Sequence, residues 1–209
     1  MRCTFLMVVV LSLVEGPLSY ATGRELYGAC ASCHAASGWG SNDGTVPSLA
    51  GQQERYLEKQ LALFRSGARV DGAMQAPAMH PRFTDRKAIA AIALYLAGLA
   101  PNPSPVKGSG AHLREGLETY ARLCSSCHGS AGRGEAGNRV PRIAGQHYPY
   151  LKEQIEAAAH LHKSLAPPEM VVGLGSISDV QRDALADYLS RLGESLGEPG
   201  QVSPREIPR

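Results

Sequence analysis

A motif of two cysteines and a histidine occurs twice in the chain, and it constrains the fold more than any other feature. It reads CASCH at 30–34 and CSSCH at 124–128, so the two copies are 94 residues apart. In a helical turn, side chains three positions apart lie on the same face. The two thiols of each copy can therefore bind the two vinyl groups of one haem, and the adjacent histidine can bind its iron.

Other chemistries explain this pattern less well. A thioredoxin-like C-x-x-C site belongs in a βαβ unit, and the sequence shows no convincing strand alternation. A zinc ion shared by both motifs leaves the repeated sequence downstream of each motif unexplained. Two small disulfides leave both histidines without a role. We therefore predict two covalently bound haem c groups, attached through Cys30, Cys33, Cys124 and Cys127, with His34 and His128 as axial ligands of the iron.

The duplication extends well beyond the motifs. The segment VPSLAGQQERYLEKQL (46–61) matches VPRIAGQHYPYLKEQI (140–155) at the same offset, and 84–99 matches 178–192 with a slip of one residue at the tyrosines. A repeat this long indicates a duplicated domain. Because helical periodicity dominates both halves, we predict an all-α fold in which two small domains each wrap around a haem. The predicted segments are a signal peptide (1–21), a first domain (22–99), a linker (100–110), a second domain (111–195) and a flexible tail (196–209).

The N-terminal sequence predicts export. Arg2 precedes an apolar run from Phe5 to Val14 that is too short to span a bilayer, and the small residues Ser19 and Ala21 suit signal cleavage. An uncleaved N-terminal anchor is the alternative. The formal net charge of +2 is too small to indicate binding to nucleic acid. We therefore predict a periplasmic protein, with loose membrane association as an option.

The sixth ligand of each iron is expected to be a methionine, which is the usual second ligand in low-spin electron carriers. In the second half the candidate is Met170, in a Pro-rich loop before the last helix. An offset of 94 residues from Met170 gives Ala76, which cannot ligate iron, and Met74 and Met79 flank it. We favour Met79, because it shares with Met170 a proline two positions earlier. Met74 and His80 are the alternatives.

These features resemble the cytochrome c4 family, whose members carry two haems in two class I cytochrome c domains. The resemblance rests on the CASCH and CSSCH motifs, the VPSLAGQ and VPRIAGQ segments, and a methionine followed by a TD or SD helix start. It covers residues 22 to about 195. The resemblance implies His/Met ligation of both haems. It also implies that the carbonyls of Pro47 and Pro141 accept hydrogen bonds from His34 and His128.

The sequence and the resemblance together predict an electron carrier rather than an enzyme. The expected partners are redox proteins, with a quinol-oxidising complex or a dehydrogenase as donor and a terminal oxidase as acceptor. One alternative is a dihaem redox enzyme of the peroxidase type, and only the ambiguity between Met74 and Met79 supports it. Another is an electron-transfer subunit of a larger dehydrogenase complex.

Overall fold

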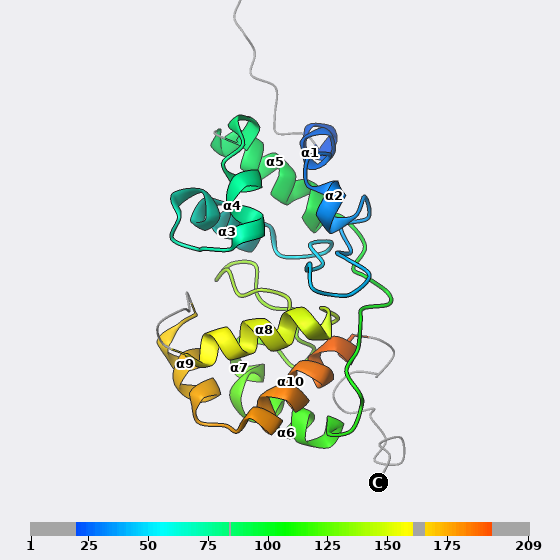
Figure 1. The fold of residues 1–209 in the computed structure, drawn as a ribbon, viewed down its shortest axis with the longest axis vertical. Coiled ribbons are helices and arrows are strands. Elements are labelled where there is room, and N and C mark those ends of the chain that lie inside the picture. The colour runs from blue at the N-terminus through cyan, green and yellow to red at the C-terminus, as the bar shows by residue number, and fades with distance from the viewer. Residues whose placement is uncertain (1–19, 84, 161–165, 194–209) are drawn as a thin grey trace, which may run out of the picture.

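The computed structural model describes residues 20–83, 85–160 and 166–193 of the 209-residue chain. Two groups of helices are stacked along its long axis (Figure 1). The first group contains α1 (Tyr20–Tyr27), α2 (Ala31–His34), α3 (Glu54–Ser66), α4 (Gly72–Ala78), the 3-10 helix η1 (Pro81–Phe83) and α5 (Arg86–Ala97). The second contains α6 (Leu113–Leu123), α7 (Ser125–His128), α8 (Tyr148–Ala159), α9 (Pro168–Gly175) and α10 (Asp179–Arg191).

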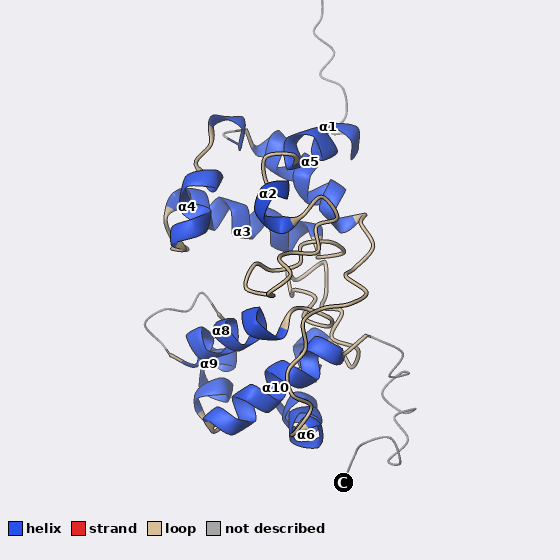
Figure 2. Cartoon of the chain, turned by 45° about the vertical axis from the view of Figure 1, so that its right-hand side comes forward, coloured by secondary structure: helices blue, strands red, loops and turns tan. Residues whose placement is uncertain are grey.

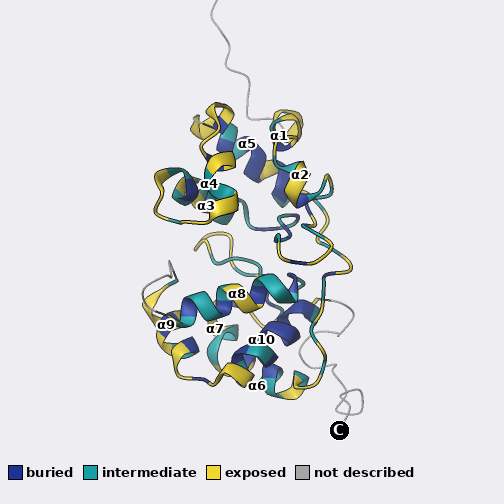
Figure 3. Cartoon of the chain, in the orientation of Figure 1, coloured by how far each residue is buried: buried dark blue, intermediate teal, exposed yellow. Residues whose placement is uncertain are grey.

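The α-helices of the two groups correspond in order, α1–α5 to α6–α10. In each group the first helix and the third helix pack against the last one. The last helices, α5 and α10, carry much of the buried surface (Figure 3). The described residues contain no strand; Glu135 and Val140 form an isolated antiparallel bridge. The prediction of an all-α, duplicated fold is confirmed. None of the helices in this part of the chain has both the length and the apolar character needed to cross a membrane.

The last helix of each group begins at a capping side chain. Asp85 accepts a hydrogen bond from the Lys87 amide at 2.9 Å, at the start of α5. Ser178 and Gln181 form a reciprocal capping box at the start of α10. Thr84, the first residue of the TD helix start, lies outside the described residues. So do the predicted tail and the predicted signal peptide, except for the two residues that open α1.

A glycine allows the first and last helices of each group to cross in close contact. A Cβ added at Gly23 would lie 2.0 Å from the carbonyl oxygen of Ala91. A Cβ added at Gly116 would lie 2.3 Å from the carbonyl oxygen of Ala184. Both distances are far below van der Waals contact. Any side chain at either glycine therefore requires the two helices to move apart.

The one-residue slip seen in the sequence has a structural explanation. The helix pair α1/α5 is related to α6/α10 by 93 positions, whereas the cysteine motifs are related by 94. One extra residue lies at the end of α6, between Tyr120 and Cys124, and the spacing returns from 94 to 93 residues before α10. The packing of the first helix against the last one fixes the spacing of 93 residues in both pairs. The added residue is therefore accommodated between α6 and the second cysteine motif. The spacing of 93 relates Gly23 to Gly116, Tyr27 to Tyr120, and Tyr95 to Tyr188.

The linker is bonded to both helix groups, and loops fill the space between the groups (Figure 2). The indole N–H of Trp39 donates to the carbonyl of Ala100 at 3.0 Å. The Val106 amide donates to Nδ1 of the buried His147 at 2.9 Å, and Nε2 of His147 lies 2.6 Å from the Trp39 carbonyl. The Asp187 carboxylate accepts from two further linker amides. The Pro- and Gly-rich segment is thus anchored along its length.

Candidate haem-binding sites

Each C-x-x-C-H motif forms a short helical turn. The amides of Cys33 and His34 donate to the carbonyl of Cys30 at 3.2 and 3.0 Å, and the second motif repeats both bonds. The first cysteine of each pair is half-buried, and the second is exposed. All four described thiols are free of disulfides. Two thiols on one face of a turn suit two thioether bonds to a single haem.

The environments of the thiols do not resemble those of a zinc site. Burial, followed by the charge of the neighbouring thiol, raises the pKa of Cys30 and of Cys124 to about 11. Zinc needs thiolates, so these environments do not favour it. Within the described ranges, no three His, Cys, Asp or Glu side chains are grouped so that they could hold a metal ion. The donor set of each motif therefore fits haem, which needs one histidine per iron from the motif.

The two histidines are buried and held by the main chain. Nδ1 of His34 lies 3.0 Å from the Pro47 carbonyl, and Nδ1 of His128 lies 3.0 Å from the Pro141 carbonyl. A carbonyl only accepts, so Nδ1 carries the proton and Nε2 is the nitrogen with a free lone pair. Burial is the main cause that lowers the pKa of both rings. Each ring is therefore neutral at neutral pH, as an iron ligand must be.

Two tyrosines that sequence reasoning missed fix the end of each motif. The Tyr27 hydroxyl donates to the carbonyl of Ala35 at 2.7 Å, one residue after His34. The Tyr120 hydroxyl donates to the carbonyl of Gly129, one residue after His128. The sequence signal that could have identified them is their spacing of 93 residues, which is also the spacing of Gly23 and Gly116. The two bonds hold the chain as it leaves each histidine.

The candidate methionines lie on α4 and α9 or next to them. Met170 is the third residue of α9, and Met74 is the third residue of α4. Met79 follows α4 as its C-cap, and 58% of it is exposed. Asp71 caps the start of α4 and lies close enough to His34 to oppose the lowering of its pKa.

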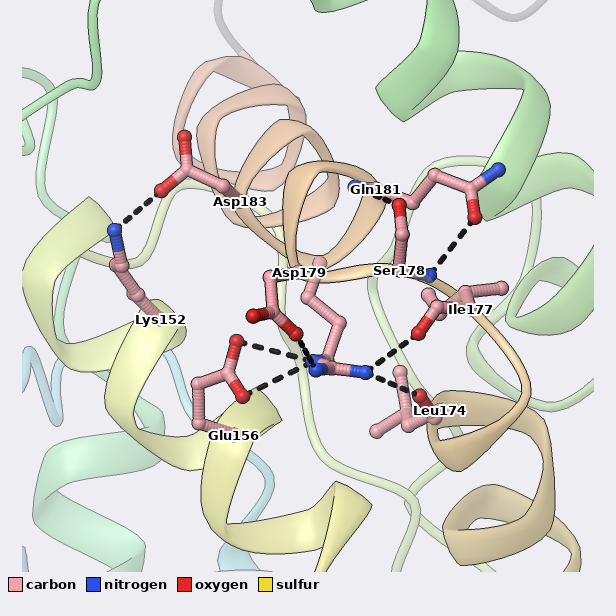
Figure 4. Close-up of polar contacts among 9 residues, drawn as sticks. Lys152, Glu156, Leu174, Ile177, Ser178, Asp179, Gln181 and Asp183 are labelled. Atoms are coloured by element: carbon pink, nitrogen blue, oxygen red, sulfur yellow. Dashed lines mark hydrogen bonds and ion pairs between the residues drawn. The ribbon is translucent and has the colours of Figure 1, made fainter.

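A buried arginine holds the helix that carries Met170. Nη1 of Arg182, on α10, donates to the carbonyls of Leu174 at 3.1 Å and Ile177 at 2.6 Å, at the end of α9. Its Nε donates to both carboxylate oxygens of Glu156 on α8, at 3.0 Å each (Figure 4). The guanidinium satisfies carbonyls left open at a helix end. It thereby ties α9 to α8 and α10.

In the first domain, an arginine from a different helix bonds to the carbonyl before the last helix. Arg65 on α3 donates to the carbonyl of Phe83, just before α5. The position of Arg182 in the helix register is taken by the buried Ile89. Sequence reasoning missed both arginines, because a charged residue on an amphipathic helix usually lies in solvent.

Two family models match the two halves separately. The model described as cytochrome c matches residues 20–100. The model described as cytochrome c oxidase, cbb3-type, subunit III matches residues 111–189. The two matches cover the two helix groups.

Named relatives span both halves. The chain is 34% identical to the thiosulfate dehydrogenase electron acceptor of Stutzerimonas stutzeri (strain A1501), over 83% of this chain and 82% of the relative. It is 31% identical to cytochrome c4 of Thiocapsa roseopersicina, over 80% of this chain and 88% of the relative. Its fold is similar to the crystal structure of reduced recombinant cytochrome c4 from Pseudomonas stutzeri. The TM-score is 0.73 at 23% identity, over 83% of this chain and 98% of that one.

The motifs, the matched halves and the relatives agree on the cofactors. Two haem c groups are bound covalently, through the cysteines of the two C-x-x-C-H motifs. The chain belongs to the cytochrome c4 family of dihaem electron-transfer proteins.

Proposed function

We propose that the chain is a periplasmic carrier that takes up and passes on single electrons, with both irons closed by a histidine and a methionine. The observation that carries this proposal is the repetition of the whole site. Each domain combines a buried histidine, bonded to a proline carbonyl, with a methionine at the third position of its fourth helix. A closed coordination sphere leaves no open position for oxygen or a substrate.

Haem iron supplies a one-electron couple when it is bound. The chain's own residues hold it in place. The cysteines attach it, and the carbonyls of Pro47 and Pro141 orient His34 and His128. A hydrogen bond from the far nitrogen also makes a ligating imidazole more basic, which stabilises the oxidised iron. The exposed second cysteine of each motif supports electron transfer through that edge of the haem.

For the first haem, the helix register supports Met74 as the sixth ligand. The residues four positions after Met74 and Met170 are Ala78 and Leu174, and both are buried. The interval from Gln154 to Met170 is two residues longer than that from Gln60 to Met74, which accounts for the failed match at Ala76. Three extra residues then separate Met74 from the start of α5, compared with Met170 and α10. The shared proline favours Met79 instead. We propose Met74, because position in a packed helix is fixed by many contacts and a Pro-x-Met pattern by one residue.

Single substitutions distinguish the two methionines. Met74→Ala is expected to open the first haem, so that carbon monoxide binds half of the reduced haem. Met79→Ala is expected to leave it closed, because that side chain lies at an exposed helix end. The measurement is carbon monoxide titration of the reduced protein followed by absorbance. The reverse pattern would assign the ligand to Met79.

We further propose a dehydrogenase as the electron donor and a terminal oxidase as the acceptor. The name of the relative from Stutzerimonas stutzeri, thiosulfate dehydrogenase electron acceptor, supports a dehydrogenase donor. It also fits the alternative in which this chain is the electron-transfer subunit of such a complex.

The first test of the carrier function is the spectrum of the purified holoprotein. We expect two haems per chain, the weak methionine-to-iron charge-transfer band at the red end of the oxidised spectrum, and no binding of carbon monoxide by the reduced protein. The physical reason is that two closed irons have no free coordination position. Carbon monoxide binding by half of the haem in the unaltered protein would instead support the dihaem enzyme.

A further inference from the structure

Two glutamines cross between the domains and bind the main chain on the other side. The amide of Gln146 donates from Nε2 to the Ser48 carbonyl and accepts at Oε1 from the Ser48 amide, at 2.9 Å each. Gln52 does the same to Arg142, donating to its carbonyl at 2.9 Å and accepting from its amide at 2.8 Å. Gln52 and Gln146 are 94 residues apart, as are Ser48 and Arg142. The arrangement is therefore reciprocal.

Both glutamine side chains are fixed in one orientation. Each is buried, with 8% exposed. Oε1 of each also accepts a 2.9 Å bond from the amide of the next residue, His147 or Gln53. Two N–H donors on one oxygen identify it as the carbonyl oxygen of the amide. A buried side chain with all these bonds made is rigid, so it can hold what it touches.

The residue held in each case directly follows the proline that supports an axial histidine. Ser48 follows Pro47, whose carbonyl is bonded to His34. In the other direction, Gln52 holds the residue after Pro141, whose carbonyl is bonded to His128. Each domain thus contributes a side chain that fixes the histidine support of the other domain.

We propose that Gln52 and Gln146 are positioning residues for the axial histidine of the opposite domain, so that each domain tunes the reduction potential of the other's haem. This rests on the proposed function, in which His34 and His128 are axial ligands. Loss of the glutamine loosens the proline carbonyl, and the hydrogen bond from the histidine weakens. A less basic imidazole stabilises oxidised iron less, so the potential of the opposite haem rises.

The test is a redox titration of the holoprotein in the Met170→Ala background. In that background the reduction potential of the second haem is expected to lie well below that of the first. The lower step of the titration then belongs to the second haem and the upper step to the first. Gln146→Leu is expected to raise the upper step, that of the first haem, and to leave the lower step in place. Gln52→Leu is expected to raise only the lower step.

Gln53 offers a matched control. Its Nε2 also crosses between the domains and donates to the Arg133 carbonyl at 2.8 Å. Arg133, however, is adjacent in sequence to neither Pro47 nor Pro141. Gln53→Leu is expected to move neither step. A shift in the glutamine's own domain, no shift at all, or an equal shift from Gln53→Leu would overturn the proposal.

Two further measurements separate folding and function from the proposal. Where a leucine variant fails to fold, Gln146→Asn and Gln52→Asn keep the polar group but are one methylene too short, and the same crossed pattern is required of them. A parent protein without two reversible one-electron steps would refute the proposed function. A parent with two such steps but without the crossed pattern refutes only this inference.

Discussion

Met170→Ala is expected to remove methionine ligation from the second haem and to lower its reduction potential by on the order of 0.1 V. A thioether favours reduced iron, and alanine provides no donor at that position. Half of the charge-transfer band should disappear, and carbon monoxide should bind one haem in two. Redox titration and carbon monoxide titration measure these effects.

Val172→Ala is the control for this substitution. Val172 lies two residues further along α9, and 70% of it is exposed, so both haem steps should keep their potentials. If both haem steps keep their potentials in Met170→Ala, Met170 is not the ligand. The second iron then has another partner.

Gly116→Ala is expected to destabilise the second domain by about 3 kcal/mol, the upper part of the range for overpacking. The added methyl group would lie 2.3 Å from the Ala184 carbonyl and 2.7 Å from the Cβ of Tyr188. Because the first of these is a main-chain atom of a buried helix, it cannot rotate away. Urea unfolding followed by helix circular dichroism measures the loss.

Gly72→Ala provides the comparison. Gly72 is also a helical glycine, at the start of α4, but nothing lies within 4 Å of an added Cβ. The free energy of unfolding of the Gly72→Ala variant should be unchanged or slightly raised, because alanine has a higher helix propensity than glycine. If Gly72→Ala and Gly116→Ala lower the free energy of unfolding equally, the close contact between α6 and α10 is not the cause of the destabilisation.

The sequence predicted what depends on local pattern. The cysteine motifs, the 94-residue repeat and the helical periods sufficed for the duplicated all-α fold. The sequence left the sixth ligand of the first haem open between Met79 and Met74, because the 94-residue spacing gives Ala76. The position of Met74 within α4, on which our proposal rests, is a feature of the fold. Buried Arg182 was missed, because its partners come from two other segments, Glu156 on α8 and the carbonyls of Leu174 and Ile177 at the end of α9.

The glutamine contacts were also beyond reach of the sequence. The segments around Gln52 and Gln146 are visibly repeated, but their bonds go to main-chain atoms in the other copy. No side-chain identity at Ser48 or Arg142 indicates such a contact. Only the stacking of the two helix groups brings the segments together.

This use of main-chain atoms makes the paired glutamine contacts isologous, as in a twofold homodimer. Each domain presents both the glutamine and the backbone that receives it. The partner's side chain at that point is not read, since Ser48 and Arg142 take part only through their amides and carbonyls. Each domain therefore carries both halves of the glutamine contact. The linker raises the effective concentration of one domain at the contact surface of the other.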